Sequence, residues 1–416
     1  MNWIRRHPNQ IVVCESTRAW DRIWIVVRAF SKALDRIRNA LHRVTSSGRF
    51  IPTVDGLRFV AILAVVMYHL NDYAVAKAIP SVAAEAKASQ LHRILACGGC
   101  GVSLFFVISG FILGCPFAEH YLRGASKPSL SRYYQRRILR IEPPYVINML
   151  VAFVLLIVVL HADAFALIPH LVASLLYMHN FVYREMSAIN CVAWSLEVEV
   201  QFYVLAPFLA TLFAIRGVLA RRAVLVGIVL LWAGMKLASG SHRIQPLGTS
   251  ILDYLDFFLC GFLLADVYVA SWNGKPTLSI WWDIVGMIGW AAIVAAHFHE
   301  TALRFLPLVI FVAYVGAFRG TVLSRFFSLP WIATIGGMCY TIYLYHFFLI
   351  SAIGRWTINL STSASYWSHI ALQAAIILPS VLAISAVLFL WLEKPFMVRD
   401  WPDRCRIALQ AAWRNV

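Results

Sequence analysis

Long apolar runs separated by short polar segments dominate the sequence. The first run covers residues 54–70, starts with a charged turn and has a histidine near its end. Nine further runs follow, at residues 96–115, 143–160, 195–215, 223–239, 251–270, 281–297, 303–318, 330–352 and 368–392. Because apolar stretches of this kind cross a bilayer as helices, we expect an all-α, polytopic helical membrane protein with about ten transmembrane helices.

The first 50 residues form a separate basic segment, with ten lysines or arginines and three acids. Between Trp20 and Val44, apolar residues recur at helical spacing and basic residues occupy the rest of the circumference. This pattern predicts an amphipathic helix on an anionic membrane surface, although the spacing also suits a partner-binding coiled coil. We assign 1–50 to this segment, 51–398 to a membrane domain and 399–416 to a short basic tail.

Clusters of cations predict the topology. Lysines and arginines gather around Arg136, Arg222 and Arg319 and in the C-terminal tail. Loops enriched in this way face the cytoplasm. With an even number of spans, both termini are then expected to be cytoplasmic.

Two interruptions of the apolar pattern are informative. Polar residues break up the stretch 161–193, so we expect a re-entrant or extracytoplasmic segment that lines a cavity and helps to form the site. The run at 96–115 carries glycines at 98, 99, 101, 110 and 114. Glycines allow membrane helices to approach closely, which predicts a close helix contact along this run.

The first run carries two ionisable residues on one face. Arg58 and His69 are eleven residues apart, which places them within about 20° around a helix and about 16 Å apart along its axis. Such groups are costly in hydrocarbon unless they face a cavity or a partner, so a functional role is expected. Imidazole titrates near neutral pH, and His69 therefore suits acid or base chemistry on a hydroxyl. The alternative is that Arg58 snorkels to the membrane surface and that His69 is hydrogen-bonded between helices. We interpret His346, in the run at 330–352, as a hydrogen-bonded core histidine of this kind.

Two carboxylates open the run at 195–215. Glu199 shares a helical face with Tyr203 at four-residue spacing, whereas Glu197 points elsewhere. A carboxylate close to His69 would orient its imidazole and raise its basicity, which makes Glu199 a second catalytic candidate. The alternative for both glutamates is solvation at a helix start, where the helix dipole favours anions.

A basic cluster precedes the run at 143–160, which begins at Pro143 and Pro144. Arg136 and Arg140 share a helical face, and Arg137 lies on the adjoining flank. Guanidinium groups in this arrangement suit phosphate. Ordinary cytoplasmic loops look similar, so the cluster alone does not establish a phosphate site.

Composition argues against several other classes of protein. The 416 residues are 61% hydrophobic and 13% charged, and the net charge of +16 is spread in clusters between apolar runs. We therefore expect no nucleic-acid partner. The eight cysteines fall mostly inside apolar runs and are interpreted as core residues. Neither the cysteine pair at 97 and 100 nor the loop at 297–300 has the context of a redox or metal site, so no metal is expected.

Six motifs follow one another in the sequence: 55–58 with His69, then 105–111, 136–145, 194–203, 340–346 and 393–396. In this order they resemble the acyltransferase 3 family of bacterial membrane O-acyltransferases, which modify surface and exported glycans. The resemblance extends over about residues 51–398. It implies a bacterial inner-membrane enzyme with an acyl-CoA donor, usually acetyl-CoA, a hydroxyl acceptor on a glycan or lipid-linked sugar, and no tightly bound cofactor.

The resemblance also implies roles for individual residues. His69 matches the family's essential histidine, and Glu199 matches the glutamate of its tryptophan-serine-leucine motif. The basic motifs of the family, expected to bind acyl-CoA, are matched by Arg58, Arg137 and Arg140. Motif residues expected to line the site are Ser109, Trp194 and Tyr203.

Two functions follow from these patterns. The first is acyl transfer, either directly or through an acyl-enzyme on Ser109 or His69. The second is a transporter or flippase of lipid-linked sugars whose polar residues line a path without chemistry. The acceptor, the acylated position, the acyl length, the oligomeric state and the role of the N-terminal helix are not determined by the sequence.

Overall fold

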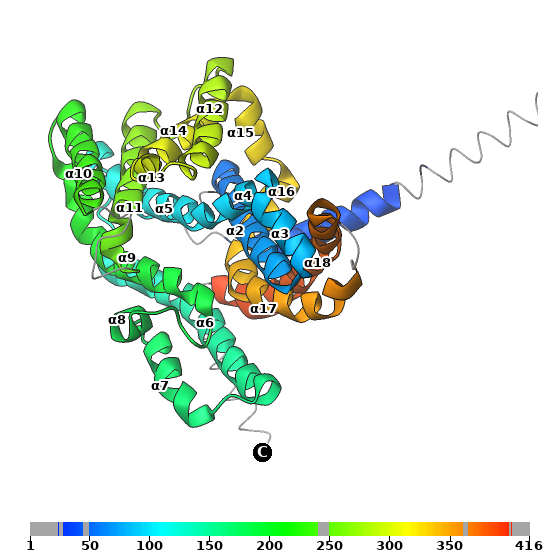
Figure 1. Cartoon of the computed structure of the whole chain (residues 1–416). Coiled ribbons are helices and arrows are strands. Elements are labelled where there is room, and N and C mark those ends of the chain that lie inside the picture. Colours follow the sequence, from blue (N-terminus) through cyan, green and yellow to red (C-terminus); the bar gives the residue numbers. More distant parts are fainter. Residues whose placement is uncertain are drawn as a thin grey trace, which may run out of the picture. The chain divides into compact units, whose positions relative to one another are not determined.

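The computed structural model describes residues 24, 28–44, 50–239, 249–360, 365–398 and 401. Within these ranges every regular element is a helix (Figure 1), which confirms the all-α class. Close contacts divide the chain into two units, Met1–His42 and Arg43–Val416.

In the first unit, residues 28–41 form a helix. The apolar side chains of Phe30 and Ile37 are exposed on it. The expected amphipathic helix is therefore present in its described part, whereas Trp20 and residues 25–27 lie outside the described residues. An exposed apolar face of this kind suits either a membrane surface or a partner helix.

The second unit contains many helices and two bent helix pairs. Its long elements are α2 (Pro52–Lys77), α5 (Gly101–Arg123), α6 (Leu130–Leu160), α9 (Trp194–Leu209), α10 (Val218–Ala238), α11 (Ile251–Asp266), α12 (Ile280–Ala296), α14 (Leu306–Arg319), α17 (Cys339–Thr357) and α18 (Tyr366–Leu388). Shorter elements are α3 (Pro80–Ala88), α4 (Gln90–Ala96), η1 (Cys97–Cys100), α7 (Ala164–Leu175), α8 (His179–Tyr183), η2 (Cys191–Ala193), η3 (Ala210–Ala214), η4 (Val267–Ser271), α13 (Glu300–Leu303), α15 (Thr321–Phe327), α16 (Pro330–Gly337), η5 (Ile358–Leu360), η6 (Phe389–Glu393) and η7 (Lys394–Met397).

The described residues form seven helices that are long and apolar enough to cross a membrane. The pairs α14 with α15 and α16 with α17 bend by 90° and 70°, and counting each pair as one span gives nine. The polytopic class is thus confirmed, but the count of ten is not. The run at 281–297 forms α12, whose 17 residues are at the lower limit for a span.

Helix α6 begins earlier than the sequence indicates. Pro143 and Pro144 predict a helix start, but α6 runs through both prolines from Leu130 to Leu160. Membrane helices tolerate internal prolines where neighbouring groups compensate for the lost backbone bonds. The basic cluster consequently lies on the first turns of α6 and not in a loop.

Residues 161–193 do not form a span. Within this stretch α7 has only 12 residues and packs along α6 (Figure 1), and η2 leads into α9. The described lining of the two cavities considered below includes no residue of this stretch, so its expected direct part in the site is not found. Its contribution is support, because the Tyr145 hydroxyl on α6 donates to the carbonyl of Ser174.

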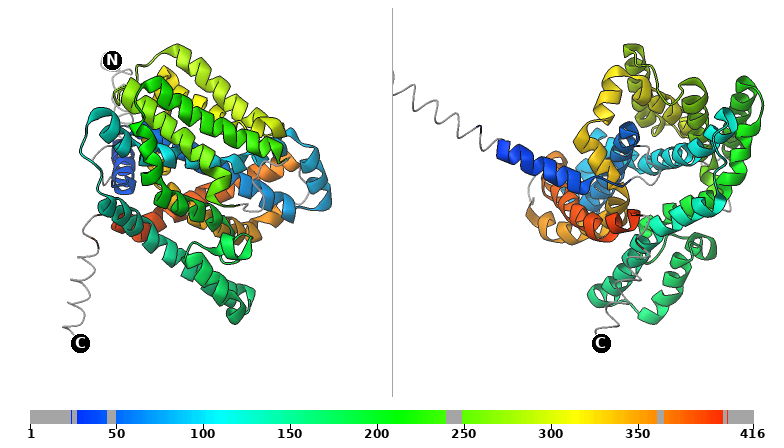
Figure 2. Two further views of the ribbon diagram at one scale, coloured as in Figure 1. Left: turned by 90° about the vertical axis from the view of Figure 1, so that its left-hand side faces the viewer. Right: turned by 180° about the vertical axis from the view of Figure 1, so that it is seen from behind.

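Helix α2, which carries Arg58 and His69, is packed against α5, α16, α17 and α18. Figure 2 shows the orange and red helices of residues 339–397 lying together near α2. This packing brings the C-terminal part of the chain to the polar face of the first span.

Glycines bring neighbouring helices into backbone contact, as the sequence predicts for the run at 96–115. A Cβ at Gly110 of α5 would lie 2.2 Å from the carbonyl oxygen of Phe258 in α11. A Cβ at Gly98 would lie 2.2 Å from the carbonyl oxygen of Ala64 in α2. Both distances are too short for any side chain, so α5 and the preceding η1 can pack in these positions only if these residues are glycines.

The variant Gly110→Ala is expected to lower the stability of the second unit by about 1–3 kcal/mol or more, because the new methyl group meets backbone and not a flexible side chain. Gly99→Ala is the matched control, since a Cβ there would lie 3.9 Å from the ring of Tyr68. Thermal unfolding of the two purified variants in detergent measures the difference. Equal midpoints would show that the α5–α11 contact does not need the glycine.

Candidate active site

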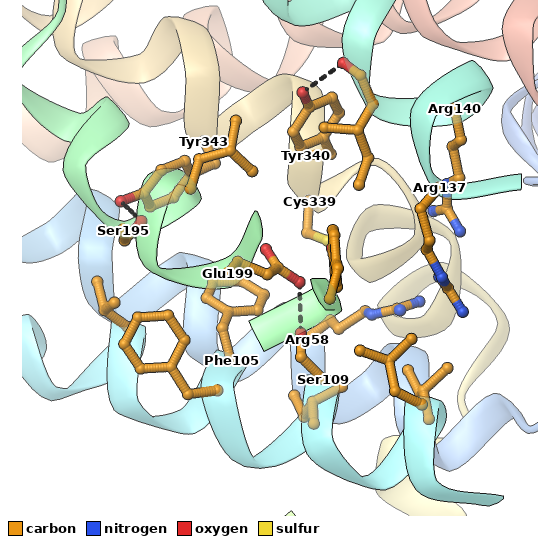
Figure 3. A pocket seen from close by; sticks show the side chains of 18 residues that line it. Arg58, Phe105, Ser109, Arg137, Arg140, Ser195, Glu199, Cys339, Tyr340 and Tyr343 are labelled. Atoms are coloured by element: carbon orange, nitrogen blue, oxygen red, sulfur yellow. Dashed lines mark hydrogen bonds between the residues drawn. The ribbon is translucent and has the colours of Figure 1, made fainter. Parts of the chain in front are cut away.

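A cavity of about 110 Å³ lies between α2, α5, α6, α9 and α17 (Figure 3). Six of the predicted site residues line it: Arg58, Ser109, Arg137, Arg140, Glu199 and Tyr203. They come from four helices that are far apart in the sequence, so the fold brings together most of the residues that the motifs indicated.

A hydroxyl and a carboxylate meet in this cavity. The Ser109 hydroxyl on α5 donates to Oε1 of Glu199 on α9 across 2.6 Å (Figure 3). Tyr203 lines the same cavity one turn along α9, as the four-residue spacing predicts. At 2.6 Å this is a short hydrogen bond, and it holds both side chains in place.

Arginines of α6 line another part of the cavity, away from Ser195 and Tyr343 (Figure 3). The guanidinium carbon of Arg137 lies 5.8 Å from the ring centre of Tyr203. The buried Nε of Arg137 has no hydrogen-bond partner among the described residues. A buried N–H group without an acceptor is costly, and an anionic ligand would supply one.

Arg58 is held by Asp55, a residue whose role the sequence pattern did not indicate. Asp55 is fully buried, and its two carboxylate oxygens accept from Arg58 at 2.7 Å and from Nε of Arg43 at 2.8 Å. Burial, together with repulsion from Arg58, lowers the pKa of Arg43 to about 10, so this guanidinium stays charged at neutral pH. One carboxylate therefore holds two cations at the cavity.

The variant Asp55→Asn is expected to cost about 3–5 kcal/mol of stability, because two poorly exposed guanidinium groups lose their shared counter-charge. The control is Asp35→Asn, which removes a carboxylate from an exposed pair with Arg38 and is expected to cost about 0–1 kcal/mol. Thermal unfolding in detergent compares the two variants. A small and equal loss in both would contradict the anchoring role of Asp55.

A second cavity, of about 670 Å³, adjoins the first and shares Arg58, Arg137 and Arg140 with it. Its lining adds three more guanidinium groups, those of Arg43, Arg123 and Arg136. The described lining has one carboxylate, that of Glu119. The two cavities thus adjoin and form one site, in which the larger cavity is strongly cationic and the smaller one holds the serine-glutamate pair.

His69 lies outside the lining of both cavities and forms a pair with another histidine. Its Nδ1 is 3.1 Å from the carbonyl oxygen of Val65 and 3.0 Å from Nε2 of His346. His346 is fully buried, which fits its interpretation as a hydrogen-bonded core residue. The ring of Tyr343, which lines the first cavity, is centred 5.8 Å from the His346 ring. The histidine pair is therefore next to the cavity wall.

Glu199 is not the partner of His69 in the structure. Oε1 of Glu199 accepts from Ser109. An orienting carboxylate would accept from Nδ1 of His69, but this nitrogen faces His346 instead. The orienting contact expected between Glu199 and His69 is therefore not found. The catalytic roles of both residues stay predictions.

Two other residues at the start of α9 lie behind the wall of the cavity. Trp194 lines neither cavity and packs on Tyr254, with ring centres 5.4 Å apart. Glu197 is fully buried and accepts the backbone N–H of Asn180 at 2.9 Å, so it is not a solvated residue at a helix start. Trp194 thus supports the site without facing it.

Three lining residues on α17 were missed from the sequence: Cys339, Tyr340 and Tyr343. The hydroxyl of Tyr343 donates to the carbonyl of Val192 at 2.8 Å, so the hydroxyl of Ser195 must donate to Tyr343 across the 2.6 Å between them. Tyr340 and Tyr343 are three residues apart in the motif at 340–346. This helical spacing was the available signal for a shared face.

The fold and the site define a polytopic helical membrane protein with an arginine-rich internal cavity. A family model described as an acyltransferase domain matches residues 51–390, and the chain belongs to this family of acyltransferases. This confirms the resemblance carried by the six motifs.

Among curated proteins, the chain is similar to the O-acetyltransferase OatA of Staphylococcus aureus, in the strains NCTC 8325 / PS 47 and COL. Each of the two is 24% identical over 341 residues, which cover 75% of this chain and 53% of the relative. The chain thus spans about half the length of the curated relatives it matches. No solved structure matches the chain.

Proposed function

We propose that the protein is a membrane O-acyltransferase that moves an acyl group, most simply acetyl, from acyl-CoA to a hydroxyl of a cell-surface or exported glycan. The observation that carries this proposal is the pair of adjoining cavities, of which the larger is lined by six arginines and the smaller contains the Ser109–Glu199 pair. Membership of the acyltransferase family supports the reaction class. The names of the relatives support oxygen as the acceptor atom and acetyl as the group.

The arginine-rich cavity is the proposed site for the head of acyl-CoA. Coenzyme A carries a diphosphate and a further phosphate, and guanidinium groups bind such groups with two parallel hydrogen bonds. Arg137 and Arg140 lie where the two cavities meet, and Arg137 has a buried donor to offer. In this arrangement the pantetheine arm extends from the larger cavity into the smaller one.

We propose His69 as the general base. As the acceptor hydroxyl attacks the thioester carbonyl, Nε2 of His69 takes the hydroxyl proton, the carbon–sulfur bond breaks, and the departing CoA thiolate receives the proton. Glu199 is proposed as a second catalytic residue in the smaller cavity, where Tyr203 lies beside it and where it accepts the hydrogen bond of the Ser109 hydroxyl. Acyl-CoA is consumed as a substrate in this scheme, and no tightly bound cofactor takes part.

For the location we propose a bacterial inner membrane with both termini in the cytoplasm. The cationic cavity then faces the compartment that supplies acyl-CoA, in agreement with the position of the basic cluster at the start of α6. The glycan or lipid-linked sugar reaches the histidine pair from the membrane or from its far side.

Transfer of radiolabel from acetyl-CoA tests the proposed function. Membranes containing the full chain, with those lacking it as the control, are incubated with labelled acetyl-CoA, and surface glycans are examined by mass spectrometry for an added acetyl mass. We expect label in glycan only where the chain is present. Movement of a lipid-linked sugar without label in any glycan would instead support a transporter or flippase.

A further inference from the structure

We propose that His346 is a positioning residue that, together with the carbonyl of Val65, holds the proton of His69 on Nδ1, and that it orients the His69 ring and stabilises its charged form during acyl transfer. The inference rests on the proposed function of His69. The two histidines are 277 positions apart in the sequence, on α2 and α17, and their nitrogens lie 3.0 Å apart.

The surroundings of His346 determine where its proton lies. Its Nδ1 is 2.7 Å from the carbonyl oxygen of Tyr343 and 3.1 Å from that of Ile342. Carbonyl oxygens only accept, so Nδ1 of His346 must carry the proton. In a neutral imidazole the other nitrogen, Nε2, then has a lone pair and acts as an acceptor.

The same reasoning applies to His69. Its Nδ1 faces the carbonyl oxygen of Val65 at 3.1 Å and the lone pair on Nε2 of His346 at 3.0 Å. Both neighbours accept, so Nδ1 of His69 carries the proton. Nε2 of His69 is therefore left with the lone pair, which is the state a general base requires.

The contact gains strength when His69 takes up a proton. Once Nε2 binds the acceptor's proton, the ring is positive and its Nδ1–H bond to His346 becomes charge-assisted. The ring of His346 is fully buried and held by carbonyls of its own helix, so it does not need to reorient during the reaction. This arrangement follows the logic of a base and its orienting group, with a neutral imidazole in place of a carboxylate.

The same geometry distinguishes positioning from mere packing. The side-chain amide of asparagine stands about where Nδ1 of histidine stands, so His346→Asn can donate to the carbonyls of Ile342 and Tyr343 but cannot reach His69. The amide of glutamine extends to the place of Nε2, so His346→Gln can accept from His69. If His346 only fills space in the core, His346→Asn should transfer acetyl groups as fast as His346→Gln or faster.

The experiment measures acetyl transfer by the full chain in proteoliposomes, with acetyl-CoA as the donor and the glycan fraction of the host membrane as the acceptor. For His346→Asn we expect kcat to fall about ten- to hundredfold, with KM for acetyl-CoA unchanged because His346 lines neither cavity. For His346→Gln most of this loss is expected to be restored. In the His69→Gln background, His346→Asn should reduce the residual rate no further, since the two residues act as one unit.

A wild-type kcat in His346→Asn, or equal losses in the two variants, would overturn the inference while leaving the proposed function intact. Absence of transfer by the wild-type protein would refute the proposed function instead. A measurement on the wild-type protein keeps the test independent of how the variants fold. Nitrogen-15 spectra of histidine-labelled protein, assigned with His69→Gln, should show His69 protonated on Nδ1, and protonation on Nε2 alone would overturn the proposal.

Discussion

In membranes that carry the variant His69→Gln, acetyl transfer from acetyl-CoA is expected to fall by about 10²–10⁴-fold, the usual contribution of a positioned acid–base group. Glutamine occupies similar space, but its amide does not take up a proton near neutral pH. The ring of His69 packs against Tyr68, His346 and Phe347, and His69 is not part of the lining of either cavity. KM for acetyl-CoA should therefore change little. Initial rates with labelled acetyl-CoA, normalised to the amount of inserted protein, measure both effects.

The control is His297→Gln, which makes the same chemical change at an exposed histidine outside the lining of both cavities. This variant should retain the wild-type rate. Full activity of a correctly inserted His69→Gln protein would rule out the proposed base. Loss of activity in both variants would indicate a general sensitivity to histidine replacement and not a specific role of His69.

For Arg137→Gln we expect KM for acetyl-CoA to rise about ten- to hundredfold with kcat largely retained, because a charged donor to a phosphate is worth about 1.5–3 kcal/mol. The buried Nε of Arg137 lacks a partner among the described residues, so a bound phosphate would be its acceptor. The effect should disappear with S-acetylpantetheine, which has no phosphate. Initial rates over a range of concentrations of each donor measure the change.

Arg132→Gln is the matched control, because it removes the same charge from the same helix at an exposed position that lines neither cavity. We expect its KM for acetyl-CoA to stay close to the wild-type value. An equal rise in both variants would mean that the overall positive charge attracts the donor. A rise that persists with S-acetylpantetheine would place Arg137 at the acyl end and not at the phosphates.

The helices and the membrane class could be predicted from the sequence because they depend on local properties. An apolar run needs a helix to satisfy its backbone in a membrane, wherever its neighbours lie. The prediction that helix α6 starts at Pro143 was wrong because it, too, relied on a local property. Pro143 and Pro144 end or begin a helix by their local preference, but packing in the bundle lets α6 continue through them.

The site was predicted in part. Arg58, Ser109, Arg137, Arg140, Glu199 and Tyr203 line one cavity because helical spacing and the family motifs place them on inward faces. Two other predicted site residues do not line it, since Trp194 packs behind the wall and His69 turns to His346. Spacing along one helix indicates which residues share a face, but it does not indicate which helix lies opposite.

By itself the sequence determined the helical membrane class, the acyltransferase family and the set of polar residues on inward faces, because these follow from composition, periodicity and short motifs. Only the tertiary structure decided the distant partners, Ser109 for Glu199 and His346 for His69. The pair of Asp55 and Arg58 is three residues apart, but the other two pairs are 90 and 277 apart. Contacts over such distances arise from the packing of several helices at once, and no local pattern encodes them.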